Sequence, residues 1–231
     1  MSIDFTFSYI SSIQSAIKKM KFKYLFIIIT LTILTIGCNS KQELLELKLN
    51  SASNYPRWLK TDDYRTNQTS GITFIGEDEG NKEFLLIDDI GMIHRLFISD
   101  DTVFTFEPIT FSKKAENFFV GYPKLDFEDI CYDRFSNSVF ISIEGNETNF
   151  KDYTGILQMK FKDDNVHKNE IDRIVKLKIT PEKQFLQYTE WNIGYEGLTV
   201  DSNYLYLGLE GFKNEFGFAD STIIFVVDKQ N

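Results

Sequence analysis

Histidine is scarce in this sequence, where only His94 and His167 occur among 231 residues. A zinc site with three histidine ligands therefore cannot form within one chain, and a Ser-His-Asp triad has only two candidate bases. We expect His94 on the face of a strand and His167 in a solvated loop. The sequence also contains no G-x-S-x-G, H-E-x-x-H, C-x-x-C or glycine-rich phosphate loop, so the common hydrolase, metalloprotease and redox signatures are absent.

Basic residues, proline and glycine are also few. The 25 Lys and Arg against 34 Asp and Glu give a net charge of −9. This balance argues against nucleic acid or an anionic membrane surface as a partner, because both bind a basic face. With 4 Pro and 13 Gly the chain is neither collagen-like nor of low complexity. Its 22 Phe and 11 Tyr supply a hydrophobic core and exclude intrinsic disorder.

No apolar run reaches the roughly 20 residues that span a bilayer. The run from Tyr24 to Ile36 follows a lysine cluster and ends at a cysteine, which predicts a signal sequence over residues 1–37. Leu34-Thr35-Ile36-Gly37-Cys38 resembles the lipobox of bacterial lipoproteins. The resemblance implies that Cys38 is lipidated and that the acyl chain anchors the protein in a lipid bilayer of the bacterial cell envelope, the outer membrane. The alternative is a plain secretory signal.

Two further expectations concern the amino-terminal part. Met20 opens a segment that reads as a complete signal by itself, so residues 1–19 are interpreted as a start-site artefact. Residues 38–60 are expected to form the lipidated cysteine and a polar tether. With Cys38 acylated, Cys131 has no disulfide partner. The neighbouring Asp129 and Asp133 would raise its pKa, which favours a buried, unreactive thiol.

Three copies of one pattern follow from residue 70 onward. Each reads strand, turn, strand ending in a carboxylate, turn, strand. The repeated unit predicts an all-β fold, a β-propeller of four-stranded antiparallel blades, over residues 61–231. The expected strands are 70–74, 84–89, 92–97 and 102–106 in the first copy, 128–132, 139–145, 155–161 and 173–179 in the second, and 196–200, 205–211 and 222–227 in the third.

The third copy ends without a fourth strand. Leu45–Leu49 alternates as a strand should and is one candidate for the missing outer strand. The other interpretation is a carboxy-terminally truncated piece of a larger ring. Trp58, Trp191 and the many Phe side chains are expected to pack between blades.

The motifs "SGITF…LLIDDIG", "FEDICYD…ISIEG" and "NIGYEGLTVD…LYLGLEG" resemble those of the phytase-like esterase propellers and of the SdiA-regulated propellers. The resemblance extends from Ser70 to Asp228. It implies an exported six-bladed propeller that hydrolyses phosphate or carboxylate esters with the support of a metal. The three copies would then be half of a ring.

Carboxylates recur at matching positions of the copies. Glu128 and Glu196 open first strands, where the first copy has Ser70. Symmetric placement would direct such side chains toward the central channel, and clustered carboxylates repel one another unless a cation or proton lies among them. Oxygen-only clusters suit Ca²⁺. The candidate Ca²⁺ ligands are Asp88, Asp89, Glu128, Glu144, Glu196 and Glu210, and the candidate catalytic residues are Glu196 and Glu210.

Three functions remain open at this point. The first is metal-assisted hydrolysis or binding of a small ester, phosphoester or peptide ligand, with the bound ion polarising an oxygen. The second is a non-catalytic scaffold that binds a peptide or glycan, and the third is a truncated, inactive remnant. In a purely structural interpretation the carboxylates cap the turns that end each strand.

Overall fold

The computed structural model describes residues 59–60, 65–78, 80–99, 103–211 and 222–230. The chain divides into two compact units, 1–50 and 51–231, and every described residue belongs to the second. The signal sequence, Cys38, the Leu45–Leu49 strand and Trp58 lie outside the described residues, so the expectations about them stay predictions.

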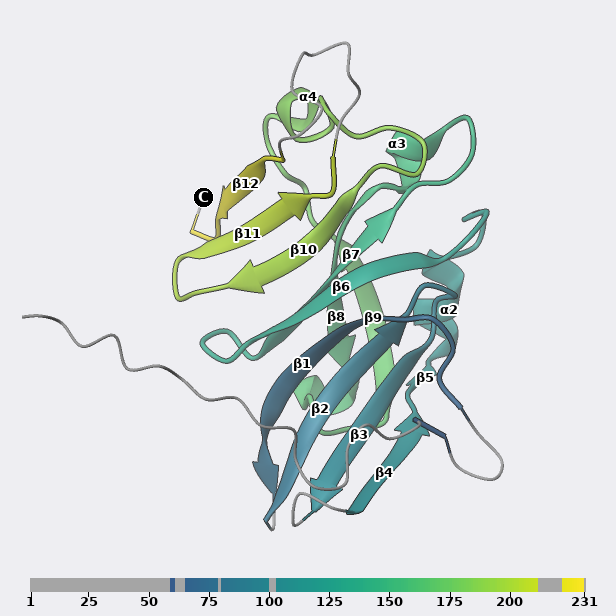
Figure 1. Ribbon diagram of the computed structural model, residues 1–231, viewed down its shortest axis with the longest axis vertical. Helices are drawn as coiled ribbons and strands as arrows, with labels where there is room; N and C mark the ends of the chain where they lie inside the picture. The colour runs from purple at the N-terminus through teal and green to yellow at the C-terminus, as the bar shows by residue number, and fades with distance from the viewer. Residues whose placement is uncertain (1–58, 61–64, 79, 100–102, 212–221, 231) are drawn as a thin grey trace, which may run out of the picture. The chain divides into compact units, whose positions relative to one another are not determined.

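The described chain is mostly β-structure (Figure 1). Short helices and turns occupy the links between strands. The helical segments are α2 (Lys113–Phe118), α3 (Phe150–Tyr153), η1 (Lys162–Asp164) and α4 (Glu182–Phe185). The strands are β1 (Thr69–Asp78), β2 (Asn81–Asp88), β3 (Ile93–Ser99), β4 (Val103–Pro108), β5 (Thr110–Phe111), β6 (Asp126–Asp133), β7 (Ser138–Glu144), β8 (Gly155–Phe161), β9 (Glu170–Lys176), β10 (Tyr195–Val200), β11 (Tyr204–Leu209) and β12 (Ile224–Asp228).

Three sheets follow one another along the chain, with strand orders β1-β2-β3-β4, β5-β9-β8-β7-β6 and β10-β11-β12. Consecutive strands within each sheet pair antiparallel, and β5 alone pairs parallel, with β9. Each expected strand overlaps one observed strand, with ends that differ by up to four residues. The two-residue strand β5 was not predicted, and it makes the second sheet five-stranded where four strands were expected. The short helices were not predicted, because four to six residues are too few to give a helical period. Among the described residues no helix is long and apolar enough to cross a membrane.

The second sheet is covered on both faces. All seven residues of β7 are buried, whereas β11 alternates exposed and buried positions. A continuous apolar run is typical of a strand with both faces covered, and alternation is typical of a strand with one face covered. One face packs on the first sheet through residues such as Leu85 and Ile141, and the other packs on the third sheet through Phe140 and Leu207.

The thiol of Cys131 lies in the core shared by the second and third sheets. Burial, together with the charges of Asp129 and Asp133, raises its pKa to about 12. A thiol with this pKa stays protonated at neutral pH and is a poor nucleophile. The expectation of a buried cysteine is confirmed, and the raised pKa supports the expectation that its thiol is unreactive.

The first strands of the three sheets lie beside one another, with β6 between β1 and β10. Side chains connect them: Asp129 Oδ2 accepts a hydrogen bond from the Leu198 N–H at 2.6 Å, and Ser70 Oγ donates to the Phe127 carbonyl at 2.6 Å. A Cβ atom at Gly71 would lie 2.7 Å from Asp129 Oδ1, so only glycine fits there. These contacts fix the spacing of the three strands.

A buried arginine connects the first sheet to the second. Arg95 on β3 forms an ion pair with Glu83 on β2, and both side chains are almost fully buried. The guanidinium also donates to Asn169 Oδ1 at 2.6 Å and to two carbonyls, those of Val166 and Lys168, at 2.8 and 2.7 Å. The acceptors of these three hydrogen bonds all lie in the segment that links β8 to β9. Arg95 therefore holds that segment against the first sheet.

We expect Arg95→Met to lower the free energy of unfolding by about 3–5 kcal/mol, because it leaves Glu83 as a buried charge without its guanidinium. Urea unfolding of the full chain measures the change. Lys113→Ala is the control, since its ion pair with Glu116 is exposed and is worth less than about 1 kcal/mol. Equal losses in the two variants would contradict the role given to Arg95.

Candidate metal site

Each first strand carries a β-bulge near its start. The register shifts at Ser70 in β1, at Glu128 in β6 and at Glu196 in β10. These are the positions that the repeat aligned from sequence. A bulge turns its extra side chain out of the regular alternation, so the same backbone irregularity sets the direction of Glu128 and Glu196.

The ends of the second strands match from one copy to the next. Opposite the residue before each bulge lie Asp88 in β2, Ile143 in β7 and Leu209 in β11. One residue further along stand Asp89, Glu144 and Glu210, which are therefore equivalent. The sequence comparison treated Glu144 and Glu210 as one position, and the register confirms this. It also selects Asp89 rather than Asp88 as their counterpart in the first copy.

The carboxylates of Asp126, Glu128 and Glu144 come together at this end of β6 and β7. Each offers one oxygen, and these oxygens all lie within 4.8 Å of one another. Asp126 and Glu144 are buried and Glu128 is half-buried. Sequence reasoning missed Asp126. The β6–β7 hairpin register, which places it directly opposite Glu144, is the signal that could have found it.

One lysine and one amide contact this cluster. Lys124 Nζ lies 2.5 Å from Asp126 Oδ1, and the side-chain amide of Asn146 donates to Asp126 Oδ2. Glu144 has no such compensation at one atom: its Oε1 is buried and has no hydrogen-bond partner among the described residues. A buried acceptor without a partner is costly, so a proton or a cation bound at this atom would stabilise the cluster.

Burial and mutual repulsion alter the titration of the cluster. Burial, followed by the charges of Glu128 and Glu210, raises the pKa of Glu144 to about 8. Burial, followed by the charges of Asp126 and Glu196, raises the pKa of Glu128 to about 7. These couplings show that carboxylates from the second and third sheets lie close enough to act on one another.

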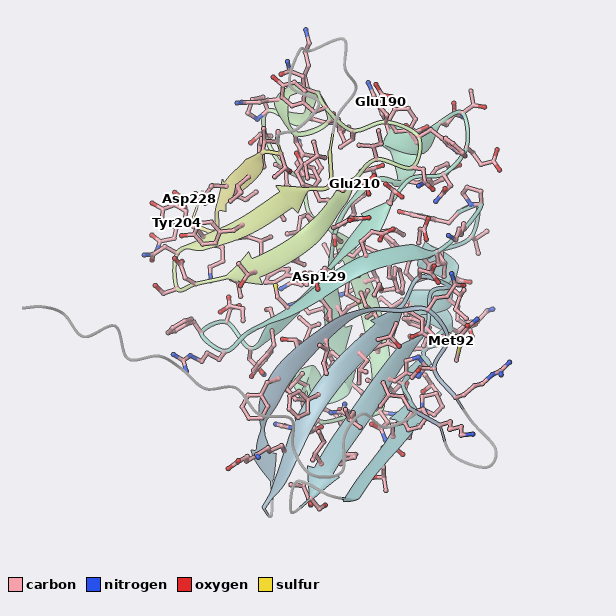
Figure 2. The ribbon with its side chains drawn as sticks, viewed as in Figure 1. Met92, Asp129, Glu190, Tyr204, Glu210 and Asp228 are labelled. Carbon is pink, nitrogen blue, oxygen red and sulfur yellow. The ribbon has the colours of Figure 1, made fainter. Side chains whose placement is uncertain are left out.

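Glu196 and Glu210 form a second pair at the edge of this cluster. Figure 2 shows Glu210 just beyond the end of β11, where its N–H donates to the Gly194 carbonyl at 3.1 Å. Burial, then a hydrogen bond with the Glu196 side chain, raises the pKa of Glu210 to about 7. Both residues are exposed. The Glu210 carboxyl therefore exchanges its proton near neutral pH, at a position that is open to solvent.

The two aspartates of the first copy differ. Asp88 is fully buried, with Oδ2 2.9 Å from His94 Nε2, and it accepts hydrogen bonds from Asn67 N–H and Thr69 Oγ1. Its side chain is thus engaged within the first sheet. Asp89 instead interacts with the groups of the cluster. Burial raises its pKa, and the positive charge of Lys124 partly offsets that rise. Its Oδ1 also lacks a hydrogen-bond partner in the described part of the chain.

His167 is half-exposed, as expected, and its Nδ1 contacts Glu83 Oε2. His94 lies on a strand face, as expected, but that face is fully buried. Neither histidine is part of the carboxylate cluster.

Comparison with known proteins identifies no relative of this chain: no family model, curated protein or solved structure matches it.

The arrangement suits one class of ligand. Its donors are carboxylate oxygens, with neither imidazole nor thiolate among them, and carboxylates directly opposite one another on neighbouring strands destabilise a sheet. Either protons or a cation must offset that repulsion. Hard cations with oxygen ligands, Ca²⁺ above all, fit this donor set.

The raised pKa values give the cation-free protein a characteristic dependence on pH. Between pH 4.5, the ordinary pKa of a glutamate carboxyl, and about pH 8, the folded state holds more protons than the unfolded chain does. The extra protons are bound at Glu128, Glu144 and Glu210. Their contribution to stability is therefore fully present at the acid end and is lost as the pH rises through 7 and 8.

We expect the melting temperature in EDTA to fall from about pH 5.5 to about pH 8.5. Glu144→Gln, which removes one of the three groups, should flatten the slope, whereas Glu116→Gln on the exposed surface of α2 should leave it unchanged. Thermal unfolding followed by circular dichroism measures both. A melting temperature that rises over this range would refute the assignment.

Proposed function

We propose that the protein binds Ca²⁺ through Asp126, Glu128 and Glu144. Two observations carry this proposal: Asp126, Glu128 and Glu144 each offer one oxygen within 4.8 Å of the others, and the buried Oε1 of Glu144 has no hydrogen-bond partner in the described part of the chain. Calcium–oxygen distances of about 2.3–2.6 Å place oxygens on opposite sides of one ion roughly 5 Å apart. The cluster is therefore of the size that one Ca²⁺ needs, and the ion would offset the repulsion between its ligands.

Metal-assisted hydrolysis of a small ester or phosphoester is the second candidate function. The observation that favours it is the exposed carboxyl of Glu210, whose pKa is raised to about 7 by burial and by its contact with Glu196. A group with a pKa near the working pH is suited to general acid–base catalysis. Bound Ca²⁺ would polarise the reacting carbonyl or phosphoryl oxygen and favour ionisation of a coordinated water.

Excess Ca²⁺ should raise the melting temperature of the full chain by about 5–10 °C relative to EDTA, the shift expected at about a hundredfold excess over the dissociation constant. Glu144→Gln and Glu128→Gln should abolish the rise. Both variants should still fold, because each removes a charge from a repulsive cluster. Glu116→Gln, exposed on α2, is the matched control and should keep the full rise.

The same proteins separate binding from hydrolysis. If the site is catalytic, turnover of p-nitrophenyl acetate or p-nitrophenyl phosphate should stop in EDTA and in Glu210→Gln. Calcium binding without turnover would assign the site to ligand binding alone. A melting temperature of the wild-type protein that does not change with Ca²⁺ would refute the metal site.

We also propose that the three sheets are consecutive blades of a β-propeller of the phytase-like or SdiA-regulated type. Two observations support it: the strands β1 to β4, β6 to β9 and β10 to β12 pair in chain order, and β6 lies between β1 and β10, the first strands of the other two sheets. The described sheets would form part of a ring. An experimental structure in which the three sheets do not turn about a common axis would refute this proposal.

The amino-terminal motif supports a location for the protein: an exported lipoprotein anchored through Cys38 in the bacterial outer membrane. Metabolic labelling with tagged palmitate in a bacterial host should mark the wild-type protein and its membrane fraction. Cys38→Ser should lose both the label and the sedimentation with membranes. Cys131→Ser, which removes the buried thiol, should keep both. Labelling of Cys38→Ser would contradict the anchor.

A further inference from the structure

Trp191 is held outward at the tip of a tight turn. Glu190 and Ile193 exchange backbone hydrogen bonds at 3.0 and 3.2 Å, so Trp191 and Asn192 alone form the connection between them. Asn192 has φ +55°, a left-handed conformation that asparagine tolerates. The indole is 64% exposed. The expectation that Trp191 packs between blades is therefore wrong, because the turn directs its ring into solvent.

A hollow of about 320 Å³ lies against this indole. Its walls are Glu147, Thr148 and Phe150 on one side and Trp191 on the other. Glu147 and Thr148 lead into α3, which begins at Phe150 and which Figure 1 shows beside the loop before β10. Aromatic rings beside a carboxylate and a hydroxyl are the surfaces of a site that orients a small ligand through a few polar groups.

Both walls continue directly from the carboxylate cluster. On one side Asn146, whose amide donates to Asp126, directly precedes Glu147. On the other side, a Cβ at Gly194 would lie 3.1 Å from Glu144 Oε1, which places the loop carrying Trp191 next to the proposed metal ligand. The first wall is also fixed in place, because a Cβ at Gly145 would lie only 1.9 Å from the Phe150 carbonyl oxygen. The surface that lines the hollow therefore adjoins the cluster along both walls.

We propose that this surface binds a neutral glycan, with one sugar ring stacked on Trp191 and its hydroxyls directed toward Glu147 and the Ca²⁺ at Glu144. The inference rests on the proposed calcium site and names its ligand class. The C–H face of a pyranose is apolar and weakly positive, and it matches the negative face of an indole. Hydroxyl oxygens are neutral, hard ligands that can fill the open positions of Ca²⁺.

Charge disfavours the two competing ligand classes. An anion stacked on Trp191 would lie against the carboxylate of Glu147, which lines the same hollow and whose charge the Ca²⁺ at Glu144 does not offset. An organic cation would meet the ammonium of Lys151, which lies 5.7 Å from the centre of the Phe150 ring, and would compete with the metal. A neutral polyol meets neither repulsion.

The test uses the full chain on an array of neutral oligosaccharides, in excess Ca²⁺ and in EDTA. A neutral oligosaccharide that binds in the presence of Ca²⁺ is then titrated into the Trp58→Phe variant. In this variant Trp191 is the sole tryptophan, so its fluorescence reports the contact. We expect Trp191→Ala to weaken binding at least tenfold while keeping the Ca²⁺-induced rise in melting temperature. Phe135→Ala, which removes an aromatic ring of similar exposure, is the control and should bind as the wild type does.

The outcomes distinguish this inference from the proposal beneath it. A rise in melting temperature with Ca²⁺ but no neutral oligosaccharide bound would overturn the glycan site and keep the metal site. If the oligosaccharide bound equally well in Ca²⁺ and in EDTA, and Trp191→Ala abolished that binding, the part played by the ion would be overturned. No rise with Ca²⁺ would overturn the proposed function itself. Binding that needs both Ca²⁺ and Trp191 supports the inference.

Discussion

Strand β6 carries both the packing and the chemistry of the described chain. At its middle, Asp129 accepts a hydrogen bond from the backbone of β10, and the close approach of β1 requires Gly71. At its start, Asp126 and the bulged Glu128 meet Glu144 of β7. The register of the β6–β7 hairpin therefore brings the carboxylates together on the same strand whose contacts with β1 and β10 build the core.

In the carboxylate cluster, the packing that stabilises the strands holds like charges close together. Its members lie on well-packed strands, with β7 buried at every position, so they cannot move apart to relieve their repulsion. Lys124 and Asn146 compensate Asp126, but nothing in the described chain satisfies Glu144 Oε1. Protons relieve the repulsion below neutral pH, and a divalent cation would do so above it. The contrast with Arg95 and Glu83 is informative, since that buried pair is neutral overall and its donors reach acceptors on a second segment.

Sequence periodicity predicted the strands well because each strand is short, rich in apolar residues and bounded by turns. Burial on both faces gives β7 a continuous apolar run, and burial on one face gives β11 its alternation, so both patterns are visible without coordinates. The site was predicted less completely. Glu128, Glu144, Glu196 and Glu210 do act on one another, yet Asp126 was missed and Asp88 is engaged with His94. Membership depends on register and on which hydrogen bonds form, and neither follows from composition.

The sequence by itself determined the order of the strands, the three repeated units and the recurrence of carboxylates at strand ends, because these follow from local hydrophobic pattern and turn chemistry. Only the tertiary structure decided which carboxylates share a site, which histidine pairs with which acid, and where Trp191 lies. Those outcomes depend on β-bulges at Glu128 and Glu196 and on contacts between strands far apart in the chain. A shift of one residue in register turns a side chain to the opposite face, and no local pattern in the sequence records that shift.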